Sequence, residues 1–325
     1  MDGVLSRRDL IKRSSLLPLC AATGMGLAGG GASAFAQTPI NRVGGPKLKI
    51  SLNAFSFSKA LNDHIKDRGP GMTLFDLLEF CAEHDFDAVD PTGYFFPGYP
   101  EVPSDSFVNE FKRRAFLLGL DISGTGVRND FCHPDKAKRA ADVQHIKQWI
   151  EVAAKMGAPV IRIFATNQRT GIHDGYTWDQ TAEWMAEDIK QCADYGKKYG
   201  VIVGVQNHTY FIKTADHVLK ILRMVDSPWC GLILDTGCFR SEDPYEDMAR
   251  VMPCTVNFQI KEKLLGEESN VRTDLKRLFR IIKGAGYRGY IPIETLSLKG
   301  EEYDPKVRVA RFLKEVREAL AEPSA

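Results

Sequence analysis

The sequence predicts an α/β fold, a single (β/α)8 TIM barrel, on three observations. Short runs rich in Val and Ile alternate along the chain with segments whose apolar residues recur at helical spacing. Eight such units occupy about 290 residues, which is the usual size of one barrel, and no internal linker divides them. An open doubly wound sheet is the competing topology, but the glycine-rich and phosphate-loop motifs of nucleotide sites are absent.

Each predicted strand is a short apolar run bounded by turn residues or by a helical segment. The eight runs cover residues 48–55, 86–90, 119–127, 158–165, 201–208, 231–239, 255–262 and 289–296. Each of the last four runs ends in one polar residue that can bind a metal ion. We therefore expect one parallel sheet whose polar strand ends meet at the C-terminal mouth of the barrel.

Each predicted helix lies between two of these runs or after the last one. The eight helical segments cover residues 72–84, 104–118, 135–156, 178–199, 214–225, 244–252, 271–285 and 305–320. In the first segment Leu74, Leu77 and Cys81 recur at helical spacing. Ser104 is a typical N-cap and Gly157 a typical C-cap, so they mark helix ends.

The first 36 residues carry the features of an export signal in the usual order. The pair Arg7-Arg8 precedes a weakly apolar run at 14–30, and Ala34-Phe35-Ala36 supplies the small residues that a signal peptidase reads. The predicted divisions are a twin-arginine signal peptide (1–36), a linker (37–46) and the barrel (47–325). The alternative is a basic amphipathic N-terminus of a cytosolic enzyme.

Export by this route predicts a periplasmic protein that meets the twin-arginine translocase. The route carries folded proteins, which suits a cofactor loaded in the cytoplasm. The apolar run is broken by Pro18, so we expect no stable membrane anchor.

The composition is that of a globular protein, with 44% hydrophobic and 26% charged residues. The net charge is +1 and the isoelectric point is near 7.6. We therefore expect no nucleic acid partner, because nothing in the total charge attracts a polyanion. The composition does not indicate an oligomeric state.

Polar side chains end four consecutive strands of the predicted barrel. They are Gln206, Asp235, Gln259 and Glu294. Because alternate residues of a strand share a face, all four can point into the mouth of a closed barrel. Two carboxylates and two amide oxygens suit a divalent cation, with Mn or Mg first and Co or Zn as alternatives. The competing interpretation is a parallel sheet with capping residues.

Two further features can contact a ligand at this mouth. The loop at 91–103, which includes Tyr94, is rich in Pro, Gly and aromatic residues. Its rings can form a wall on which a sugar stacks, or they can pack on one another. Arg162 is unusual in an apolar strand, because a buried guanidinium needs a carboxylate or a ligand. The sequence leaves open whether Arg162 forms a structural ion pair or lines the substrate pocket.

The last four strands resemble the xylose-isomerase-like TIM-barrel superfamily, which includes sugar isomerases and epimerases, inosose dehydratase and endonuclease IV. In that superfamily they typically read E-N-H, L-D-x-G-H, H-x-K-D and an E after apolar residues. Here they read Gln206-Asn207-His208, Leu234-Asp235-Thr236-Gly237-Cys238, Gln259-Ile260-Lys261-Glu262 and Glu294. The resemblance covers essentially all of the chain after the signal peptide.

The resemblance implies roles for these residues. The metal ligands that it implies are Gln206, Asp235, Gln259 and Glu294. The expected catalytic residues are Glu294, Lys261 and His208. The expected substrate contacts are Asn53, Tyr94, Arg162, Asn207 and Glu262.

Three residues depart from the superfamily pattern. Gln206 replaces a Glu, Gln259 replaces a His, and Cys238 replaces a His that commonly touches substrate. The four ligands then carry a charge of about −2 rather than about −3 when ionised, and the alternative to a working site is a degenerate one that holds no metal. An amide cannot accept a proton, so Glu294 is the best single base unless His208 substitutes. A one-base site favours isomerisation, β-elimination or hydration over two-base epimerisation.

The predicted function is that of a metal-dependent, sugar isomerase/epimerase-like enzyme acting on a free or 3-keto sugar through an enediolate. A 3-keto-glycoside lyase or hydratase on the same site is the alternative, as is a non-catalytic periplasmic carbohydrate-binding protein. Nuclease activity on abasic sites is disfavoured, because those relatives use a His-rich site and only His208 lies among the four strand ends. The predicted partner is a small-molecule carbohydrate.

Overall fold

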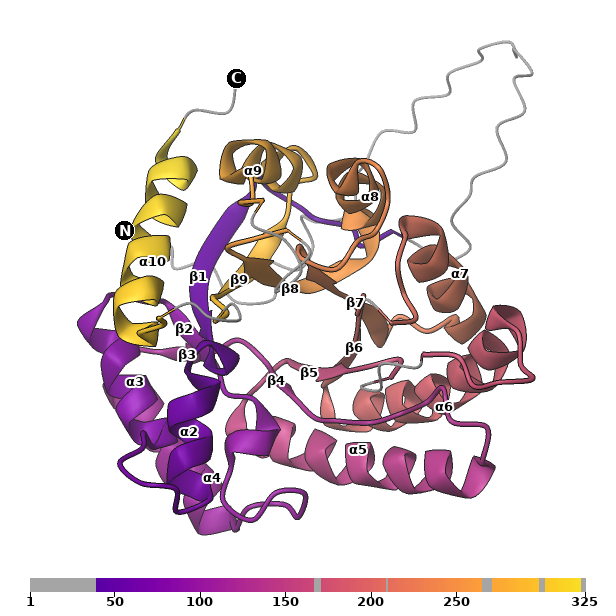
Figure 1. The fold of residues 1–325 in the computed structure, drawn as a ribbon, viewed down its shortest axis with the longest axis horizontal. Helices are drawn as coiled ribbons and strands as arrows, with labels where there is room; N and C mark the ends of the chain where they lie inside the picture. Colours follow the sequence, from indigo (N-terminus) through magenta and orange to yellow (C-terminus); the bar gives the residue numbers. More distant parts are fainter. Residues whose placement is uncertain (1–38, 167–170, 209, 265–270, 298–301, 323–325) are drawn as a thin grey trace, which may run out of the picture. The chain divides into compact units, whose positions relative to one another are not determined.

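The described residues form the predicted (β/α)8 barrel, with parallel strands inside and helices outside (Figure 1). The structure is a computed structural model, and it describes residues 39–166, 171–208, 210–264, 271–297 and 302–322. The predicted signal peptide and the first two residues of the predicted linker lie outside the described residues.

The strands of the described chain form one parallel sheet that closes on itself. They are β1 (Lys47–Asn53), β2 (Ala88–Asp90), β3 (Asp121–Ile122), β4 (Thr125–Gly126), β5 (Val160–Ile163), β6 (Ile202–Gln206), β7 (Cys230–Asp235), β8 (Thr255–Lys261) and β9 (Arg288–Glu294). Their order is β3-β2-β1-β9-β8-β7-β6-β5-β4. Because β3 pairs with β2 while β4, next in the chain, pairs with β5, the two short strands close the barrel.

The predicted strand at 119–127 is wrong in one respect, since Ser123 and Gly124 divide it into β3 and β4. Ser123 Oγ lies 2.7 Å from Ser51 Oγ of β1, and this bond crosses the inside of the barrel because β1 and β3 are not neighbours. At Gly124 a Cβ would lie only 3.0 Å from Asp90 Oδ2. The polar side chains of Ser51 and Asp90 therefore lie against residues 123–124 inside the barrel, where a regular strand would place its own side chains.

The helices surround the sheet. They are η1 (Ala54–Phe57), α2 (Ser58–Ile65), α3 (Leu74–Glu83), η2 (Gly93–Phe95), α4 (Asp105–Leu117), α5 (Lys136–Met156), α6 (Trp178–Tyr199), α7 (Ala215–Val225), α8 (Pro244–Val251), η3 (Met252–Cys254), α9 (Leu275–Gly284) and α10 (Pro305–Ala321). All eight predicted helices are confirmed, with shifts of a few residues at their ends. Within the described ranges, no helix has both the length and the apolar character that crossing a membrane requires.

The segment after β1 differs from the prediction. The predicted strand at 48–55 ends early, at Asn53, because Asn53 Oδ1 accepts a hydrogen bond from Phe55 N over 2.9 Å and starts η1. The helix α2 follows directly and buries Leu61. Asn53 thus becomes the last residue of β1, at the mouth of the barrel.

Local caps fix several helix ends. Thr73 and Asp76 form a reciprocal capping box on α3, and Thr177 and Gln180 form another on α6. Gly157 ends α5 with φ of 87°, in the left-handed region that favours glycine, as the sequence predicts. These ends set where each following strand begins.

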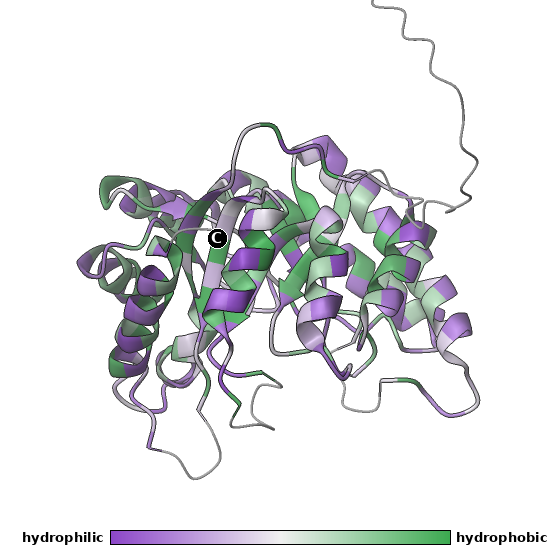
Figure 2. Ribbon diagram, turned by 90° about the horizontal axis from the view of Figure 1, so that it is seen from above, coloured by the Kyte–Doolittle hydropathy of each residue, from purple (hydrophilic) through white to green (hydrophobic). Residues whose placement is uncertain are grey.

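The apolar core fills the layer between the sheet and the helices. Trp149 of α5 and Phe111 of α4 are fully buried there, and Figure 2 shows hydrophilic residues mainly on the outer sides of the helices. The inside of the barrel is more polar, since Asn257 Nδ2 donates to Ser123 O over 3.1 Å. Side chains inside the barrel therefore have polar neighbours at several levels.

The described part of the predicted linker, residues 39–46, lies against the barrel. Ile40 N donates to Pro253 O over 3.0 Å, and Arg42 Nη2 donates to Thr255 O over 2.6 Å. Thr255 begins β8, so these contacts lie at the N-terminal end of the strands. The polar strand ends at the opposite end are left uncovered by this segment.

Candidate functional site

Four polar residues lie level with one another at the C-terminal ends of adjacent strands. Asp90 of β2 pairs with Asn53 of β1, and Glu294 of β9 pairs with Lys261 of β8. The register between β1 and β9 makes Asn53 level with Glu294. All four side chains are buried. The barrel therefore brings three of the predicted site residues together with Asp90, which the sequence analysis does not single out.

Lys261 connects the two carboxylates that were predicted to bind metal. Its ammonium donates to Glu294 Oε1 and lies 3.5 Å from Asp235 Oδ2. Burial alone would lower the pKa of the Lys261 ammonium, but the two carboxylates outweigh burial and raise its pKa above the ordinary value. Burial also raises the pKa of the Glu294 carboxyl, and Lys261 limits that rise. Lys261 is therefore a buried cation at the mouth of the barrel.

The two glutamines are joined to the same cluster. Gln206 Nε2 donates to Asp235 Oδ2 and to Gln259 Oε1, each over 2.6 Å. Gln206 Oε1 is buried and has no hydrogen-bond partner among the described residues. Since buried polar atoms normally have partners, this oxygen is a candidate acceptor for a ligand.

Asp235 is held by the turn that follows it. Its Oδ1 accepts from Gly237 N over 2.9 Å. Asn207 brackets its backbone: Asn207 Oδ1 accepts from Asp235 N over 2.7 Å and Asn207 Nδ2 donates to Asp235 O over 2.9 Å. Asn207 therefore holds the backbone of Asp235 in place, and its predicted contact with substrate stays a prediction.

Gly237 makes room for the Lys261 side chain. A Cβ at Gly237 would lie 2.8 Å from Lys261 Cγ and 3.2 Å from Lys263 O, closer than real Cβ contacts allow. Lys261 is also tied at its backbone, where its N–H donates to Thr236 Oγ1 over 2.9 Å. The D-T-G sequence after β7 therefore positions Lys261 as well as Asp235.

Arg162 of β5 has no carboxylate within ion-pair distance among the described residues. Its Nη1 donates to Val127 O over 2.7 Å, its Nη2 donates to Tyr94 Oη over 3.2 Å, and its guanidinium carbon lies 4.0 Å from the centroid of Phe164. Its Nε is buried without a partner. Of the two predicted alternatives, the geometry favours a pocket residue over a structural ion pair.

The loop at 91–103 packs its aromatic rings on one another, which is one of its two predicted roles, while the sugar-stacking role stays a prediction. Tyr94 packs edge-on against Phe95, with centroids 4.9 Å apart, and against Phe55. Its hydroxyl nevertheless reaches Arg162, and the Arg128 guanidinium lies 4.5 Å from its ring. Tyr94 is therefore part of a packed aromatic group that also borders the inside of the barrel.

His208 follows β6 and stays neutral at physiological pH. Burial, partly opposed by the Asp235 carboxylate, lowers the pKa of His208 to about 4. Its ring centroid lies 5.0 Å from that of Phe164, and its Nδ1 is buried without a hydrogen-bond partner among the described residues. A neutral imidazole with an unused nitrogen can accept or donate a proton, as a catalytic role requires.

Glu262 has a structural role in this geometry. Its carboxylate accepts from Arg272 at 3.0 Å, Arg308 at 2.6 Å and Arg311 at 3.2 Å. Glu262 is 3% exposed and points toward α10, away from the inner face that carries Lys261. The predicted substrate contact of Glu262 is therefore not supported, because three guanidinium groups already use its oxygens.

Asp90 is a site residue that the sequence analysis missed. Burial, with a smaller contribution from Glu294 and opposed by Arg162, raises the pKa of Asp90 to about 7. Its side chain forms no hydrogen bond among the described residues. The signal was present, because Asp90 ends the second predicted strand just as Asp235 and Glu294 end later ones.

The donors present can be compared with what a divalent cation needs. The oxygens of Asp235, Gln259 and Glu294 converge, but each accepts an N–H from Gln206 or Lys261. Within the described ranges no three His, Cys, Asp or Glu side chains are close enough to share an ion. As arranged here, the predicted ligand set does not fit a resident divalent cation, because N–H donors point to the place where the ion would bind.

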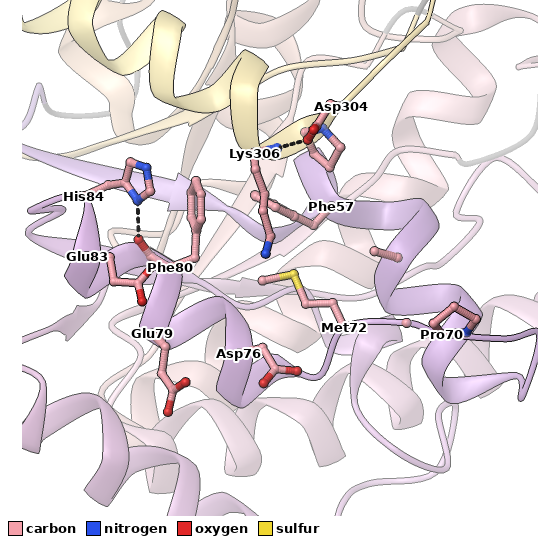
Figure 3. Close-up of a pocket in the computed structure, with 13 residues that line it drawn as sticks. Phe57, Pro70, Met72, Asp76, Glu79, Phe80, Glu83, His84, Asp304 and Lys306 are labelled. Carbon is pink, nitrogen blue, oxygen red and sulfur yellow. Dashed lines mark hydrogen bonds between the residues drawn. The ribbon is translucent and has the colours of Figure 1, made fainter.

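A hollow of about 510 Å³ lies outside the barrel between α3 and α10 (Figure 3). Asp76 and Asp304 on its wall cap these helices, and Glu79 pairs with Arg114 over 2.6 Å. Lys306 extends toward it from α10. Helix capping and ion pairing therefore account for Asp76, Asp304 and Glu79, and we place the candidate site at the mouth of the barrel.

A family model described as a xylose isomerase-like TIM barrel matches residues 78–316, which is most of the chain. The chain belongs to the xylose isomerase-like TIM barrel family. This confirms the resemblance seen in the last four strands.

Solved structures in this family's fold superpose over most of the chain. The 3-keto-D-glucoside 4-epimerase of E. coli is 14% identical, with a TM-score of 0.65, covering 84% of this chain and 100% of its own. The D-psicose 3-epimerase of Clostridium cellulolyticum H10 is 16% identical, with a TM-score of 0.68 and coverage of 84% and 99%. The D-allulose 3-epimerase of Methylomonas sp. is 16% identical, with a TM-score of 0.67 and coverage of 85% and 100%. At these identities the likeness is one of fold.

Proposed function

We propose that this protein is a sugar isomerase/epimerase-like enzyme that moves a proton beside the carbonyl group of a free or 3-keto sugar, through an enediolate. The observation that carries the proposal is the buried pair of Lys261 and Glu294, with Asp235 beside it. A carboxylate next to a fixed ammonium supplies both proton removal and oxyanion stabilisation. The three structural neighbours named above are sugar epimerases, which supports this substrate class.

Glu294 is the proposed base. It takes the proton from the carbon next to the carbonyl group, the electron pair of that C–H bond forms the C=C bond of the enediolate, and the π electron pair of the C=O bond moves onto the oxygen. Lys261 donates a hydrogen bond to this oxygen and stabilises its negative charge. Return of a proton to the neighbouring carbon gives an isomer, and return to the same carbon from the opposite face gives an epimer.

Asp90 is the proposed second proton-transfer group. Gln206 cannot serve, because an amide does not accept a proton in this pH range. Asp90 lies in the same layer as Glu294, with Asn53 between them, and its raised pKa suits proton exchange near neutral pH. Neutral His208 is the competing candidate. With a second proton-transfer group the site could also catalyse epimerisation, in addition to the one-base reactions that the sequence favours.

Elimination from a 3-keto-glycoside is the second candidate reaction. The same Glu294 would remove the C2 proton, and the leaving group would depart from C1 with its electron pair. The amide at Gln206, bonded to Asp235 and Gln259, favours this reading because it leaves that wall of the site without a base.

Solvent exchange separates these reactions. A panel of free and 3-keto sugars is incubated in deuterated water, and products are followed by NMR. For proton transfer alone we expect an isomer or epimer with deuterium at the carbon next to the carbonyl group, and for elimination we expect loss of the C2 proton with release of the aglycone. Binding of a sugar by calorimetry with no exchange from any substrate would instead identify a carbohydrate-binding protein.

The metal requirement predicted from the sequence, Mn or Mg first, stays a prediction. The donors of the predicted ligand set are bonded to Lys261 and Gln206, so the roles above use only groups of the chain itself.

We further propose that the protein is exported by the twin-arginine route and acts in the periplasm. The proposal rests on residues 1–36, which lie outside the described residues. Replacing Arg7 and Arg8 together with Lys should retain folded, active protein in the cytoplasm, as cell fractionation would measure. Periplasmic accumulation of the double variant would contradict export by this route.

A further inference from the structure

Lys261 lies where the oxygens of the predicted metal site converge. Its ammonium contacts the Glu294 carboxylate and is 3.5 Å from the Asp235 carboxylate. These are the only two of the four predicted ligands that carry a charge. The other two, Gln206 and Gln259, are neutral and hydrogen-bond to each other.

The position of Lys261 is built into the neighbouring strands. Gly237 leaves space for its stem, where a Cβ would come within 2.8 Å of Lys261 Cγ. Thr236 Oγ1 accepts from Lys261 N over 2.9 Å, and Thr273 Oγ1 donates to Lys261 O over 2.7 Å. The Lys261 side chain is 10% exposed, so it has little freedom to leave for solvent.

Charge balance gives the ammonium a necessary role. The Asp235 and Glu294 side chains are 1% and 2% exposed, and two buried carboxylates at close range need a cation. Lys261 supplies one, and Gln206 adds N–H groups to Asp235 and Gln259. A divalent ion bound to the same oxygens would be repelled by these N–H donors. The Lys261 ammonium would also have to leave the position in which the neighbouring strands hold it.

We propose that the Lys261 ammonium is the resident cation of this site, in the place of a divalent metal ion. It holds Asp235 and Glu294 together and presents an N–H to a carbonyl or hydroxyl oxygen of a ligand. The assignment concerns the free protein and holds whether or not the proposed reaction is correct. Where it is correct, Lys261 is also the group that polarises the substrate carbonyl.

The test is metal content and thermal stability of the full chain, purified without an affinity tag, loaded with Mn²⁺ and dialysed. We expect wild type to keep less than about 0.1 Mn per chain and its melting temperature to move by less than about 1 °C with Mn²⁺. Lys261→Met leaves two carboxylates without their cation, so Mn²⁺ should raise the melting temperature of that variant by about 5 °C or more.

Two further variants complete the design. Lys59→Met removes a side chain that is 90% exposed and should behave as wild type. Lys261→Met combined with Gln206→Glu and Gln259→His supplies the superfamily's donors and should bind about one Mn per chain. If neither Lys261 variant folds, the wild-type measurements alone still decide.

About one tightly held Mn per wild-type chain, or a melting shift in wild type as large as in Lys261→Met, would overturn the assignment. These readouts are independent of turnover. A metal-free wild type that exchanges no sugar proton would count against the proposed function and leave the Lys261 assignment standing, while an active enzyme with stoichiometric Mn would do the reverse.

Discussion

The polar side chains at the mouth of the barrel are hydrogen-bonded to different extents in its two halves. In the second half, Lys261, Asp235 and Gln259 are bonded into one network through Glu294 and Gln206. Among the described residues of the first half, Asn53 Nδ2 and Arg162 Nε are buried without hydrogen-bond partners, and the Asp90 side chain is buried beside them. The bonded network holds reactive groups in fixed positions and has Gln206 Oε1 as an unpaired acceptor, while the unpaired donors of the first half have capacity for a ligand. We infer that the second half holds the proposed base and its ammonium in place, while the first half supplies Asp90 for proton transfer and unpaired donors for the substrate.

The largest expected effect comes from breaking the network at Glu294. Glu294→Gln keeps the shape but removes the proposed base, so proton exchange into substrate should fall by about 10²–10⁴-fold. It also leaves Lys261 with one carboxylate, so the free energy of unfolding in urea should fall by about 3 kcal/mol.

Glu79→Gln is the control, since Glu79 makes a surface ion pair with Arg114 and should change neither quantity measurably. Wild-type exchange rates in Glu294→Gln would exclude Glu294 as the base.

Gly237→Ala tests the space that Lys261 needs. The added Cβ would overlap the Lys261 stem, and overpacking of this kind costs about 1–3 kcal/mol of stability. Displacement of the ammonium should also lower the rate of proton exchange by more than the loss of folded protein explains. Gly284→Ala at the end of α9 meets no atom within 4 Å and should be neutral, and equal effects of the two substitutions in urea unfolding would contradict the packing argument.

Asp90→Asn should raise the melting temperature by an amount that depends on pH. The pKa of Asp90 is raised from 3.8 to about 7 in the folded chain, so the folded state holds an extra proton and loses stability as pH rises from about 4 to about 7. An uncharged Asn avoids that loss. The gain in melting temperature should therefore be about 5 °C larger at pH 8 than at pH 5.

Asp121 provides a control of opposite sign. Its pKa is lowered by the hydrogen bond from Lys49, so its stabilisation is present above the unfolded pKa and is lost in acid. Asp121→Asn should therefore destabilise the protein slightly at pH 8 and not at pH 3. A pH-independent effect of Asp90→Asn would show that Asp90 is charged throughout.

The smallest expected effect is on recognition. Arg162→Lys keeps the positive charge, but the single nitrogen of lysine cannot bond to both Val127 and Tyr94 and still offer the free N–H that Arg162 has at Nε. We expect KM to rise about tenfold with kcat nearly unchanged, whereas Arg113→Lys on the exposed face of α4 should change neither. A fall in kcat with constant KM would move Arg162 from recognition to chemistry.

Much of the fold could be predicted from local pattern. Helix spacing and caps such as Gly157 gave the eight helices, because these signals act within a few residues. The same signals did not foresee the break at Ser123 and Gly124 or the early end of β1 at Asn53. The break depends on polar groups that meet across the inside of the barrel, whereas the early end of β1 comes from the local hydrogen bond of Phe55 N to Asn53 Oδ1.

The sequence by itself determined which residues end the strands, and therefore which side chains can meet at the mouth. Only the tertiary structure decided how they pair. Glu262 follows Lys261 in the chain, yet Glu262 bonds to arginines of distant segments while Lys261 turns inward to Asp235 and Glu294. The physical reason is that strand periodicity alternates faces locally, whereas a buried charge takes the partners that the closed sheet brings within reach.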